Sequence, residues 1–305
     1  MKMWTLFLVA MLLQLMSTAT NANQSSSKSQ SSQDDNIESY TPSADDAVNV
    51  SEVSQVKVIH DLPATKVHVG VIGQSFVYRE PDIDIKDSGR LTGLEASIQY
   101  AMKPDLYLRG SMQFLTGNLK YDGHLMNSNA AYESNNDYKV REFKADASIK
   151  TDISEENDVF FYAGLGRKET LQANNPSEKA DYARDIIYNY YSLGTYVNVV
   201  VNDQATLVFD VGIESLLFGG VNTHLSDVSS RYDDIYLKFK SGSSLGGDIS
   251  LLYKLTSSDV ITAKIGFRLW KVDQSEETYS NSDKTYYIEP KNTTQITTLG
   301  VGYQF

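Results

Sequence analysis

The sequence predicts an all-β chain that folds as a transmembrane antiparallel β-barrel of about ten strands, preceded by a disordered N-terminal extension. Three observations support this prediction. Segments in which every second residue is apolar follow one another from residue 66 to the end of the chain. The connections between these segments alternate between short and long. The chain also ends on such a segment, with Phe305 as its last residue.

The last expected strand, residues 290–305, shows the alternation most clearly. Leu299, Val301, Tyr303 and Phe305 alternate with Gly and Gln. Successive side chains of a strand point to opposite faces, so one face of this strand is apolar. In water an exposed apolar strand invites aggregation. In a closed barrel the same face would contact lipid, which explains the pattern.

The same alternation places ten strands along the chain. They are expected at residues 66–80, 89–101, 105–121, 138–151, 158–172, 184–201, 204–220, 236–255, 259–275 and 290–305. Eight or twelve strands also fit, because boundaries drawn in this way are uncertain by about two to four residues.

The connections between the strands fall into two classes. Short ones are expected at residues 102–104, 152–157, 202–203 and 256–258. Longer, polar ones are expected at residues 81–88, 122–137, 173–183, 221–235 and 276–289. Outer-membrane barrels have short periplasmic turns and long extracellular loops. An even strand number then places both ends of the barrel in the periplasm.

Several charged residues within the strands lie opposite the apolar positions, and that parity assigns them to the lumen. A charge on the lipid face at the bilayer midplane would cost about 2–4 kcal/mol. We expect a lumen closed by ion pairs, with Arg109 beside Asp146, and Asp248 near Lys264 and Arg268. Lys150, Lys168 and Lys254 would lie nearer the ends of the strands. The full expected network comprises Glu95, Arg109, Lys144, Asp146, Asp210, Glu214, Asp248, Lys264 and Arg268.

Composition excludes several classes of protein. After the N-terminus no apolar run is long enough to form a transmembrane helix. The absence of Cys excludes disulfides, thiolate metal sites and a lipid-anchoring cysteine. A net charge of -12 argues against nucleic acid as a partner. With only four scattered His, neither a metal site nor a cofactor is expected.

The N-terminal part predicts export. Residues 1–22 read as a signal peptide, with Lys2 before a short apolar run and small residues at its end. Residues 23–62 begin with a Gln- and Ser-rich stretch that cannot bury a core, so we expect a low-complexity periplasmic tether. Residues 63–305 would then form the outer-membrane barrel.

Several motifs together resemble an uncharacterised family of single-chain outer-membrane β-barrel proteins of Gram-negative bacteria. They are Phe76 to Pro81, Leu119 to Gly123, Tyr162 to Arg167, Phe267 to Trp270, and Glu289 to Thr294. The resemblance implies fold and outer-membrane location but no activity. Leu299, Val301, Tyr303 and Phe305 also resemble the C-terminal signal of such proteins, which implies recognition by the barrel-assembly machinery. The surroundings would be outer-membrane lipid and lipopolysaccharide, and we expect a monomer.

Candidate chemistry is sparse, and we do not expect an enzyme. The omptin proteases of the outer membrane are ten-stranded and need two acids facing an Asp–His pair. Asp82 and Asp84 with Asp122 and His124 could supply those residue types at the rim, although they are also ordinary turn residues. The sequence His224-Leu-Ser-Asp227 holds the residue types of a nucleophilic triad in a loop.

Tyr279, Tyr286 and Tyr287 lie in the last long connection. They fit the interfacial aromatic girdle best, or else a surface that binds partners. The leading hypothesis for the whole chain is a structural or surface-interaction role. The alternatives are a narrow pore or transporter, and a rim protease.

Overall fold

The computed structural model describes residues 65–124, 130–152, 157–175 and 182–305. The expected signal peptide (1–22) and most of the expected tether (23–62) precede these ranges, so both predictions lie outside the described residues. Within them, no helix has the length and apolar character needed to cross a membrane.

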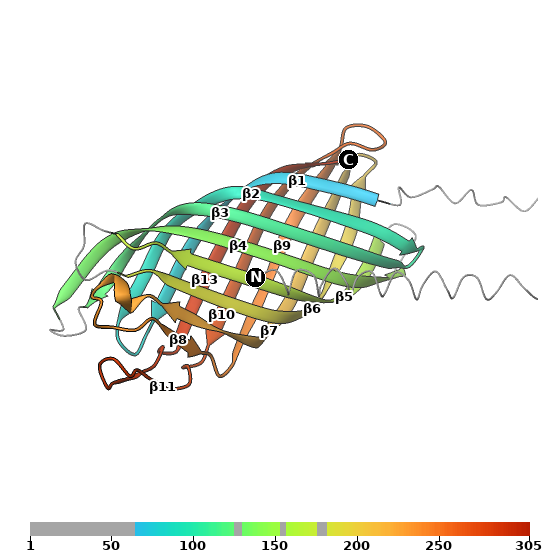
Figure 1. Cartoon of the computed structure of the whole chain (residues 1–305). Coiled ribbons are helices and arrows are strands. Elements are labelled where there is room, and N and C mark those ends of the chain that lie inside the picture. Colours follow the sequence, from blue (N-terminus) through green and yellow to red (C-terminus); the bar gives the residue numbers. More distant parts are fainter. Residues whose placement is uncertain (1–64, 125–129, 153–156, 176–181) are drawn as a thin grey trace, which may run out of the picture. The chain divides into compact units, whose positions relative to one another are not determined.

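The described residues form a closed antiparallel barrel, which confirms the expected fold (Figure 1). Neighbouring strands pair in the order β6-β5-β4-β3-β2-β1-β13-β10-β9-β7, and β7 pairs with β6 to close the ring. The first and last strands meet in the β1–β13 pair. The ten barrel strands are β1 (Thr65–Glu80), β2 (Ile85–Lys103), β3 (Leu106–His124), β4 (Ala131–Asp152), β5 (Asn157–Gln172), β6 (Arg184–Asn202), β7 (Ala205–Thr223), β9 (Gly242–Lys254), β10 (Val260–Val272) and β13 (Asn292–Gln304).

Four short elements lie in the two longest connections. The 3-10 helix η1 (Leu225–Asp227) and strand β8 (Ile235–Lys238) follow β7, whereas β11 (Thr278–Tyr279) and β12 (Tyr286–Tyr287) form a small hairpin between β10 and β13. We call the end of the barrel that carries these connections the loop end, and the opposite end the turn end. By the rule for outer-membrane barrels the loop end is extracellular.

The expected strand 236–255 is interrupted in the structure. Its first part is β8, which pairs with Gly220–Thr223 of β7, and its second part is β9, which pairs with Ala205–Ser215. Between them β7 carries an extra residue, Leu217, which has no partner in β6 and forms a bulge. A bulge bends its strand and ends regular pairing, so the neighbouring strand breaks at the same level.

Three strands begin or end farther toward the loop end than the apolar alternation predicts. β2 starts at Ile85 instead of 89, β3 continues to His124, and β4 starts at Ala131 instead of 138. These extensions are polar, yet they pair in regular register, as in Tyr121 opposite Ser134. Alternation of apolar residues marks only the part of a strand that faces lipid, and it fails where the strand continues into water.

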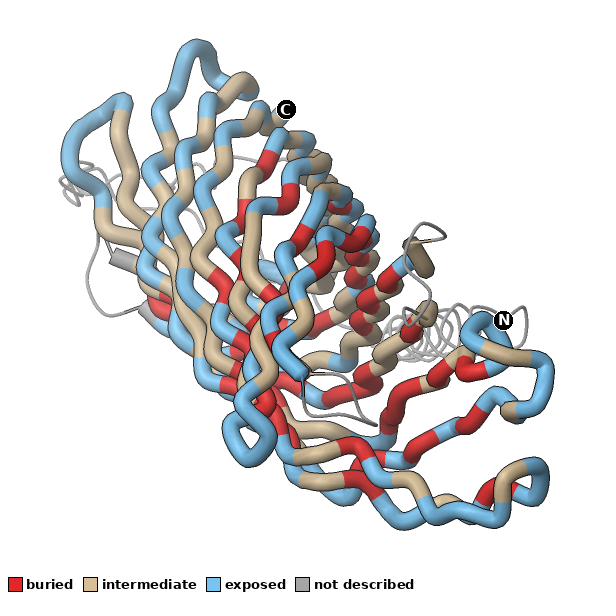
Figure 2. The backbone as a smooth tube through the Cα atoms, turned by 90° about the vertical axis from the view of Figure 1, so that its left-hand side faces the viewer, coloured by how far each residue is buried: buried red, intermediate tan, exposed pale blue. Residues whose placement is uncertain are grey.

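The two faces of the wall differ as predicted. Outward positions are apolar and open, with Leu299 60% and Val301 62% exposed, whereas Leu91 and Trp270 on the inner face are fully buried. Figure 2 shows this alternation of buried and exposed positions along the strands. An apolar exterior around a closed hydrogen-bonded wall is the arrangement that lipid requires.

Buried side chains fill the lumen in three clusters. Two of them, built around Phe76 with Leu119 and around Tyr190 with Trp270, lie toward the loop end. The third joins Tyr107, Phe160, Tyr162 and Tyr196 toward the turn end. Tyr162 lies across the neighbouring strands β6 and β7 only because Gly194 and Gly212 lie there, since a Cβ at either position would collide with its ring or hydroxyl.

Candidate functional site: the lumen and the loop end

A polar cavity of about 370 Å³ occupies the lumen below the loop-end clusters. Charged side chains of both signs line it, and most of them were expected there from strand parity. They include His68, Glu95, Arg109, Lys144, Asp210, Glu214, Asp248, Lys264 and Arg268. The cavity therefore lies between an aromatic layer at the turn end and a packed layer at the loop end.

Arg109 and Asp146 lie side by side on β3 and β4. The Arg109 Nε donates to Asp146 Oδ2 at 3.1 Å, and the guanidinium carbon lies 5.6 Å from the ring centroids of Tyr162 and Tyr196. Lys144 lies over the Tyr162 ring at 4.7 Å. Two cations thus use one aromatic pair, which supplies cation–π attraction in addition to the ion pair.

Lys264 and Glu95 form an ion pair of 2.5 Å although they come from β10 and β2. Strands β1 and β13 lie between them. Gly300 lies beneath both side chains, with the Lys264 Cε 3.5 Å and the Glu95 Oε1 3.6 Å from where its Cβ would be. Missing side chains on the intervening strands therefore let the two charges meet.

Glu142 of β4 is the central acceptor of the lumen. Arg268 donates to its two oxygens at 2.7 and 3.0 Å, and Tyr190 and Gln113 donate to it as well. Arg268 also approaches Glu214 at 3.5 Å. The sequence analysis did not name Glu142, although it lies two residues before Lys144 and so has the parity of the lumen.

Some expected partners differ from those observed. Asp248 accepts from Ser250 at 3.2 Å, since Lys264 is paired with Glu95 and Arg268 with Glu142. Asp210 accepts from Tyr162 of β5 at 3.0 Å. Near the ends of the strands, Lys150 pairs with Asp158 at 2.9 Å, Lys168 is buried, and Lys254 is exposed. Barrel shear shifts heights between strands, so parity predicts the face of a residue better than its partner.

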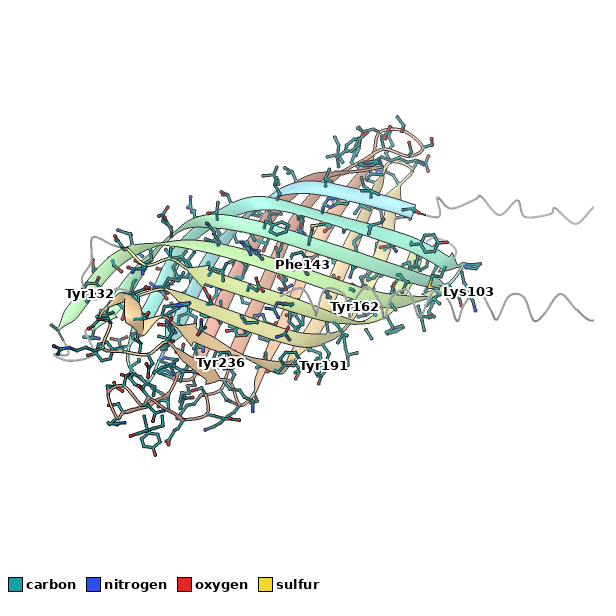
Figure 3. The ribbon with its side chains drawn as sticks, viewed as in Figure 1. Lys103, Tyr132, Phe143, Tyr162, Tyr191 and Tyr236 are labelled. Carbon is teal, nitrogen blue, oxygen red and sulfur yellow. The ribbon has the colours of Figure 1, made fainter. Side chains whose placement is uncertain are left out.

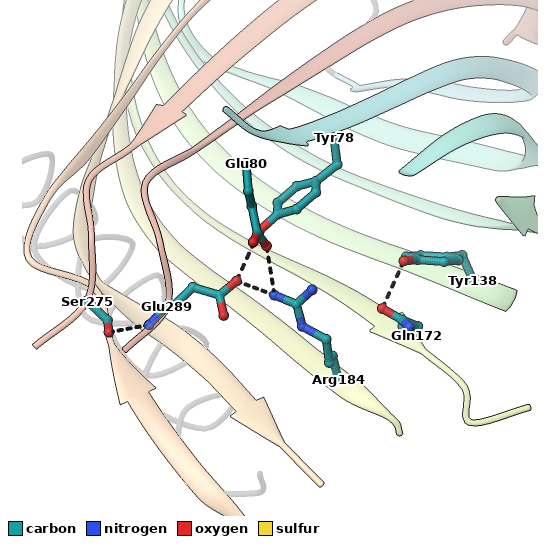
Figure 4. A network of polar contacts seen from close by, with 7 residues as sticks. All are labelled: Tyr78, Glu80, Tyr138, Gln172, Arg184, Ser275 and Glu289. Carbon is teal, nitrogen blue, oxygen red and sulfur yellow. Dashed lines mark hydrogen bonds and ion pairs between the residues drawn. The ribbon is translucent and has the colours of Figure 1, made fainter. Parts of the chain in front are cut away.

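A second polar cluster lies at the mouth of the barrel, where Arg184 begins β6 and Glu80 ends β1 (Figure 4). Arg184 donates to Glu80 at 3.4 Å and to Glu289, which precedes β13. The Tyr78 hydroxyl lies 2.6 Å from Glu80 Oε1 and 3.0 Å from Glu289 Oε1. One hydroxyl proton cannot serve two carboxylates, so both contacts are hydrogen bonds only when one carboxyl is protonated.

Glu289 is the group that burial favours in its protonated form. Burial, with a further contribution from the negative charge of Glu80, raises its pKa to about 7, against the opposing attraction of Arg184. The backbone of Glu289 also pairs with Ser275, which fixes the base of the last connection. The cluster therefore joins the last loop to the walls at β1 and β6.

The tyrosines of the last loop divide into two groups. Tyr287 is half-buried and donates to Asp283. Tyr279 and Tyr286 lie in the hairpin with ring centroids 5.0 Å apart, and Tyr286 is 66% exposed. Ile288 and Tyr236 of β8 are exposed near the same hairpin, since Thr278 bonds to the Tyr236 carbonyl (Figure 3). We call Tyr236, Tyr279, Tyr286 and Ile288 the tyrosine face. These residues lie on elements of the two longest connections, whereas an interfacial aromatic girdle lies on the barrel strands.

The rim residues considered for proteolysis lie at the neighbouring ends of β2 and β3, where Lys86 is opposite Asp122, but they are held by separate contacts. Asp82 pairs with Lys291 at 3.0 Å, and Asp84 occupies the left-handed region with φ 52° in a tight turn. Asp122 lies opposite Glu133 and His124 opposite Ala131 in the β3–β4 register. Across the described ranges, no hydrogen bond or ion pair connects these two acid pairs.

The loop histidine also departs from a nucleophilic triad. His224 lies 3.3 Å from Asp185 and 3.2 Å from Asp234, while Asp227 accepts the backbone N–H of Ala183. Burial opposes the charged form of His224, but the hydrogen bonds that the imidazole donates to Asp185 and Asp234 raise its pKa. In the part of the chain that the structure describes, no three His, Asp or Glu side chains are arranged to hold a metal.

Comparison with solved structures identifies the architecture. The outer membrane protease OmpT from Escherichia coli matches with a TM-score of 0.50 and 11% identity, over 79% of this chain and 96% of that chain. A closed wall with an apolar exterior belongs in a bilayer, and barrels of this kind occur in bacterial outer membranes.

The chain has the fold of an outer-membrane β-barrel. The translocator domain of the autotransporter NalP from Neisseria meningitidis matches the barrel at 12% identity with a TM-score of 0.42, over 81% of this chain and 90% of that one. Ail, the attachment invasion locus protein of Yersinia pestis, matches at 12% identity with a TM-score of 0.28, over 79% of this chain and 98% of that one. No protein-family model and no curated protein matches the sequence. At these identities the similarity of the barrel extends to fold and not to activity.

Proposed function

We propose that this outer-membrane barrel is closed to solutes and acts through its extracellular loops, as a structural or surface-interaction protein. Outer-membrane lipid and lipopolysaccharide surround it, the barrel-assembly machinery recognises its last strand, and it works as a monomer. The observation that carries the proposal is the packing of the lumen toward the loop end.

The two loop-end clusters are joined at Ile186, which packs against both. Trp270 and Tyr190 contact one another with ring centroids 5.5 Å apart, and both are fully buried. Phe76 and Tyr138 lie 6.5 Å apart in the other loop-end cluster. Ten strands enclose an interior only slightly wider than the eight-stranded barrels that side chains fill. A solute would have to displace these rings and the Arg268–Glu142 pair below them.

The loops offer the surface that such a role needs. Exposed tyrosines are enriched where proteins bind partners, because they provide contact area with little loss of conformational entropy. The tyrosine face is held by the hairpin and by contacts to β8, so it is presented in a defined arrangement.

Single-channel recording in planar bilayers tests the closed lumen. We expect the purified protein to show no stable conductance under conditions in which a reference porin conducts. A matched variant, Trp270→Ala with Tyr190→Ala, removes two rings of the packed layer and should produce intermittent openings if it still folds. Steady open-channel currents from the wild-type protein would replace this proposal with the pore or transporter.

Hydrolysis at the rim is not part of the proposal. Asp82 is engaged in an ion pair with Lys291 and Asp84 in a tight turn, and among the described residues neither bonds to Asp122 or His124. Peptide cleavage that disappears in both Asp84→Ala and His124→Ala would show that the rim is nevertheless catalytic.

A further inference from the structure

Three cations lie together on the outer wall of the barrel. Lys139 and Arg141 of β4 alternate with Val140 and Glu142, which are buried in the lumen, so their side chains point outward. Arg167 of β5 also points outward, because Lys168 next to it is buried. The register places Arg141 opposite Glu169 and Arg167 opposite Phe143, so the cations are diagonal neighbours. We call Lys139, Arg141 and Arg167 the outer-wall cations.

The outer-wall cations begin where the apolar band ends. On β4 the next outward residue toward the turn end is Phe143, which packs edge to face against Phe114 of β3 at 5.5 Å. On β5 the corresponding residue is Leu165. All three apolar side chains are exposed on the outer face (Figure 3 labels Phe143). The cations therefore lie at the boundary between the hydrocarbon region and the head groups on the extracellular side.

The protein leaves most of this charge unpaired. Arg167 donates to Glu169 at 2.7 Å and to Asn189 at 3.3 Å. Neither Lys139 nor Arg141 forms an ion pair with any residue that the structure describes. With the carboxylates of Glu169 and of Asp137, the next outward residue of β4, the three cations leave a net charge of one positive unit. By contrast, Lys120, another outward cation, is paired with Glu133 at 2.8 Å.

We propose that the outer-wall cations bind the phosphate groups of a phosphorylated glycolipid of the outer leaflet, namely lipopolysaccharide. Arginine forms bidentate hydrogen bonds to phosphate, and these are strong where the surroundings are only partly hydrated. A lipid bound there by its phosphates would place its acyl chains along Phe114, Phe143 and Leu165. The proposal rests on the position of the barrel in the outer membrane and is independent of what the loops bind.

The test compares three proteins in detergent micelles: wild type, a Lys139→Gln, Arg141→Gln double variant, and Lys271→Gln. Lys271 is a matched control, because it is an exposed cation that ends the outward apolar run of β10 and is far from β4 in the strand order. Each protein is titrated with bisphosphorylated lipid A, with chemically dephosphorylated lipid A and with inorganic phosphate. Native mass spectrometry measures the protein–lipid adduct, and the temperature of heat modification on gels measures stabilisation.

We expect the double variant to bind bisphosphorylated lipid A about tenfold or more weakly than wild type, since two charge-assisted contacts are lost. Lys271→Gln should bind as wild type does, and dephosphorylated lipid A should bind all three proteins equally weakly. Arg141→Lys keeps the charge but loses the bidentate geometry, so it should bind more weakly than wild type and more tightly than the double variant, which provides a second test if the double variant does not fold. Equal affinity of wild type and double variant would overturn the proposal. Stabilisation by inorganic phosphate alone would also overturn it, because the site would then not be specific for lipid.

Discussion

At the scale of single residues, the lumen shows how a narrow barrel accommodates buried charge. Glu142 accepts four hydrogen bonds from three residues, and Arg268 is the only cation among these three donors. Charges removed from water need partners that satisfy both their charge and their hydrogen bonds. The pair therefore fixes the arrangement of side chains at the centre of the barrel.

Removal of Arg268 should be costly, because Glu142 would lose the only cation that donates hydrogen bonds to it, although the buried Lys168 would remain nearby. Breaking a buried pair in this way typically costs about 3–5 kcal/mol. We expect Arg268→Ala to lower the temperature of heat modification on gels, and Glu142→Gln in the same chain to restore part of the loss. If Arg268→Ala had the same temperature of heat modification as wild type, water would be stabilising the Glu142 carboxylate in place of Arg268.

Glu289 should make the attachment of the last loop depend on pH. Its pKa of about 7 in the folded protein lies above its ordinary value of 4.5. The folded state therefore holds an extra proton between these two values, so the stabilisation is complete below the ordinary pKa and is lost as pH rises through about 7. Above that pH, Glu289 and Glu80 are both charged beside one Arg184.

Hydrogen exchange over residues 273–291 measures this effect. Exchange corrected for its intrinsic rate should be slower at pH 5 than at pH 8.5, and Glu289→Gln should remove most of the difference. The groups that face Glu289 are Arg184, Glu80, Tyr78 and Tyr188. A pH dependence that persists unchanged in Glu289→Gln would assign it to another group, for which His224 is the first candidate.

At the scale of elements, sequence predicted the strands well where they face lipid and less well where they do not. β1, β5 and β6 begin or end within a residue or so of their expected positions, since apolar alternation runs almost their full length. The polar extensions of β2 and β4 were missed because apolar alternation marks only the part of a strand that faces lipid. The break between β8 and β9 depends on the bulge at Leu217, which no local pattern signals.

The candidate sites follow the same division. Parity predicted which charges enter the lumen, because a charge on the lipid face is too costly. It could not predict that Lys264 reaches Glu95 over Gly300, since that pair depends on strands distant in sequence. The cluster of Arg184, Glu80 and Glu289 was missed altogether, because its members come from the ends of β6 and β1 and from the last connection, which only the closed barrel brings together.

The closing pair of strands predicts a specific effect of the C-terminus. Phe305 exchanges two backbone hydrogen bonds of 2.9 Å with Val67 and is 54% exposed on the outer face. Deletion of Phe305 removes both bonds from the β1–β13 seam and the aromatic group expected to be read during assembly. We expect less folded, heat-modifiable protein in the outer membrane, whereas Phe305→Trp should restore it. Unchanged levels of the deleted chain under strong expression would contradict the expectation.

At the scale of the whole molecule, the barrel should fold without the sequence that precedes it. The strands of the barrel pair only with one another, and the ring is complete from β1 to β13. Residues 23–46 carry no apolar periodicity, so they offer no face that could pack against the wall. A chain that starts at Val58 behind a foreign signal peptide should therefore insert in the outer membrane with the same heat-modification temperature as the full chain. A chain of equal length in which residues 23–46 are shuffled serves as the control for export. Degradation of the shortened chain, with normal insertion of the shuffled one, would show that the N-terminal segment contributes to folding through its length or composition.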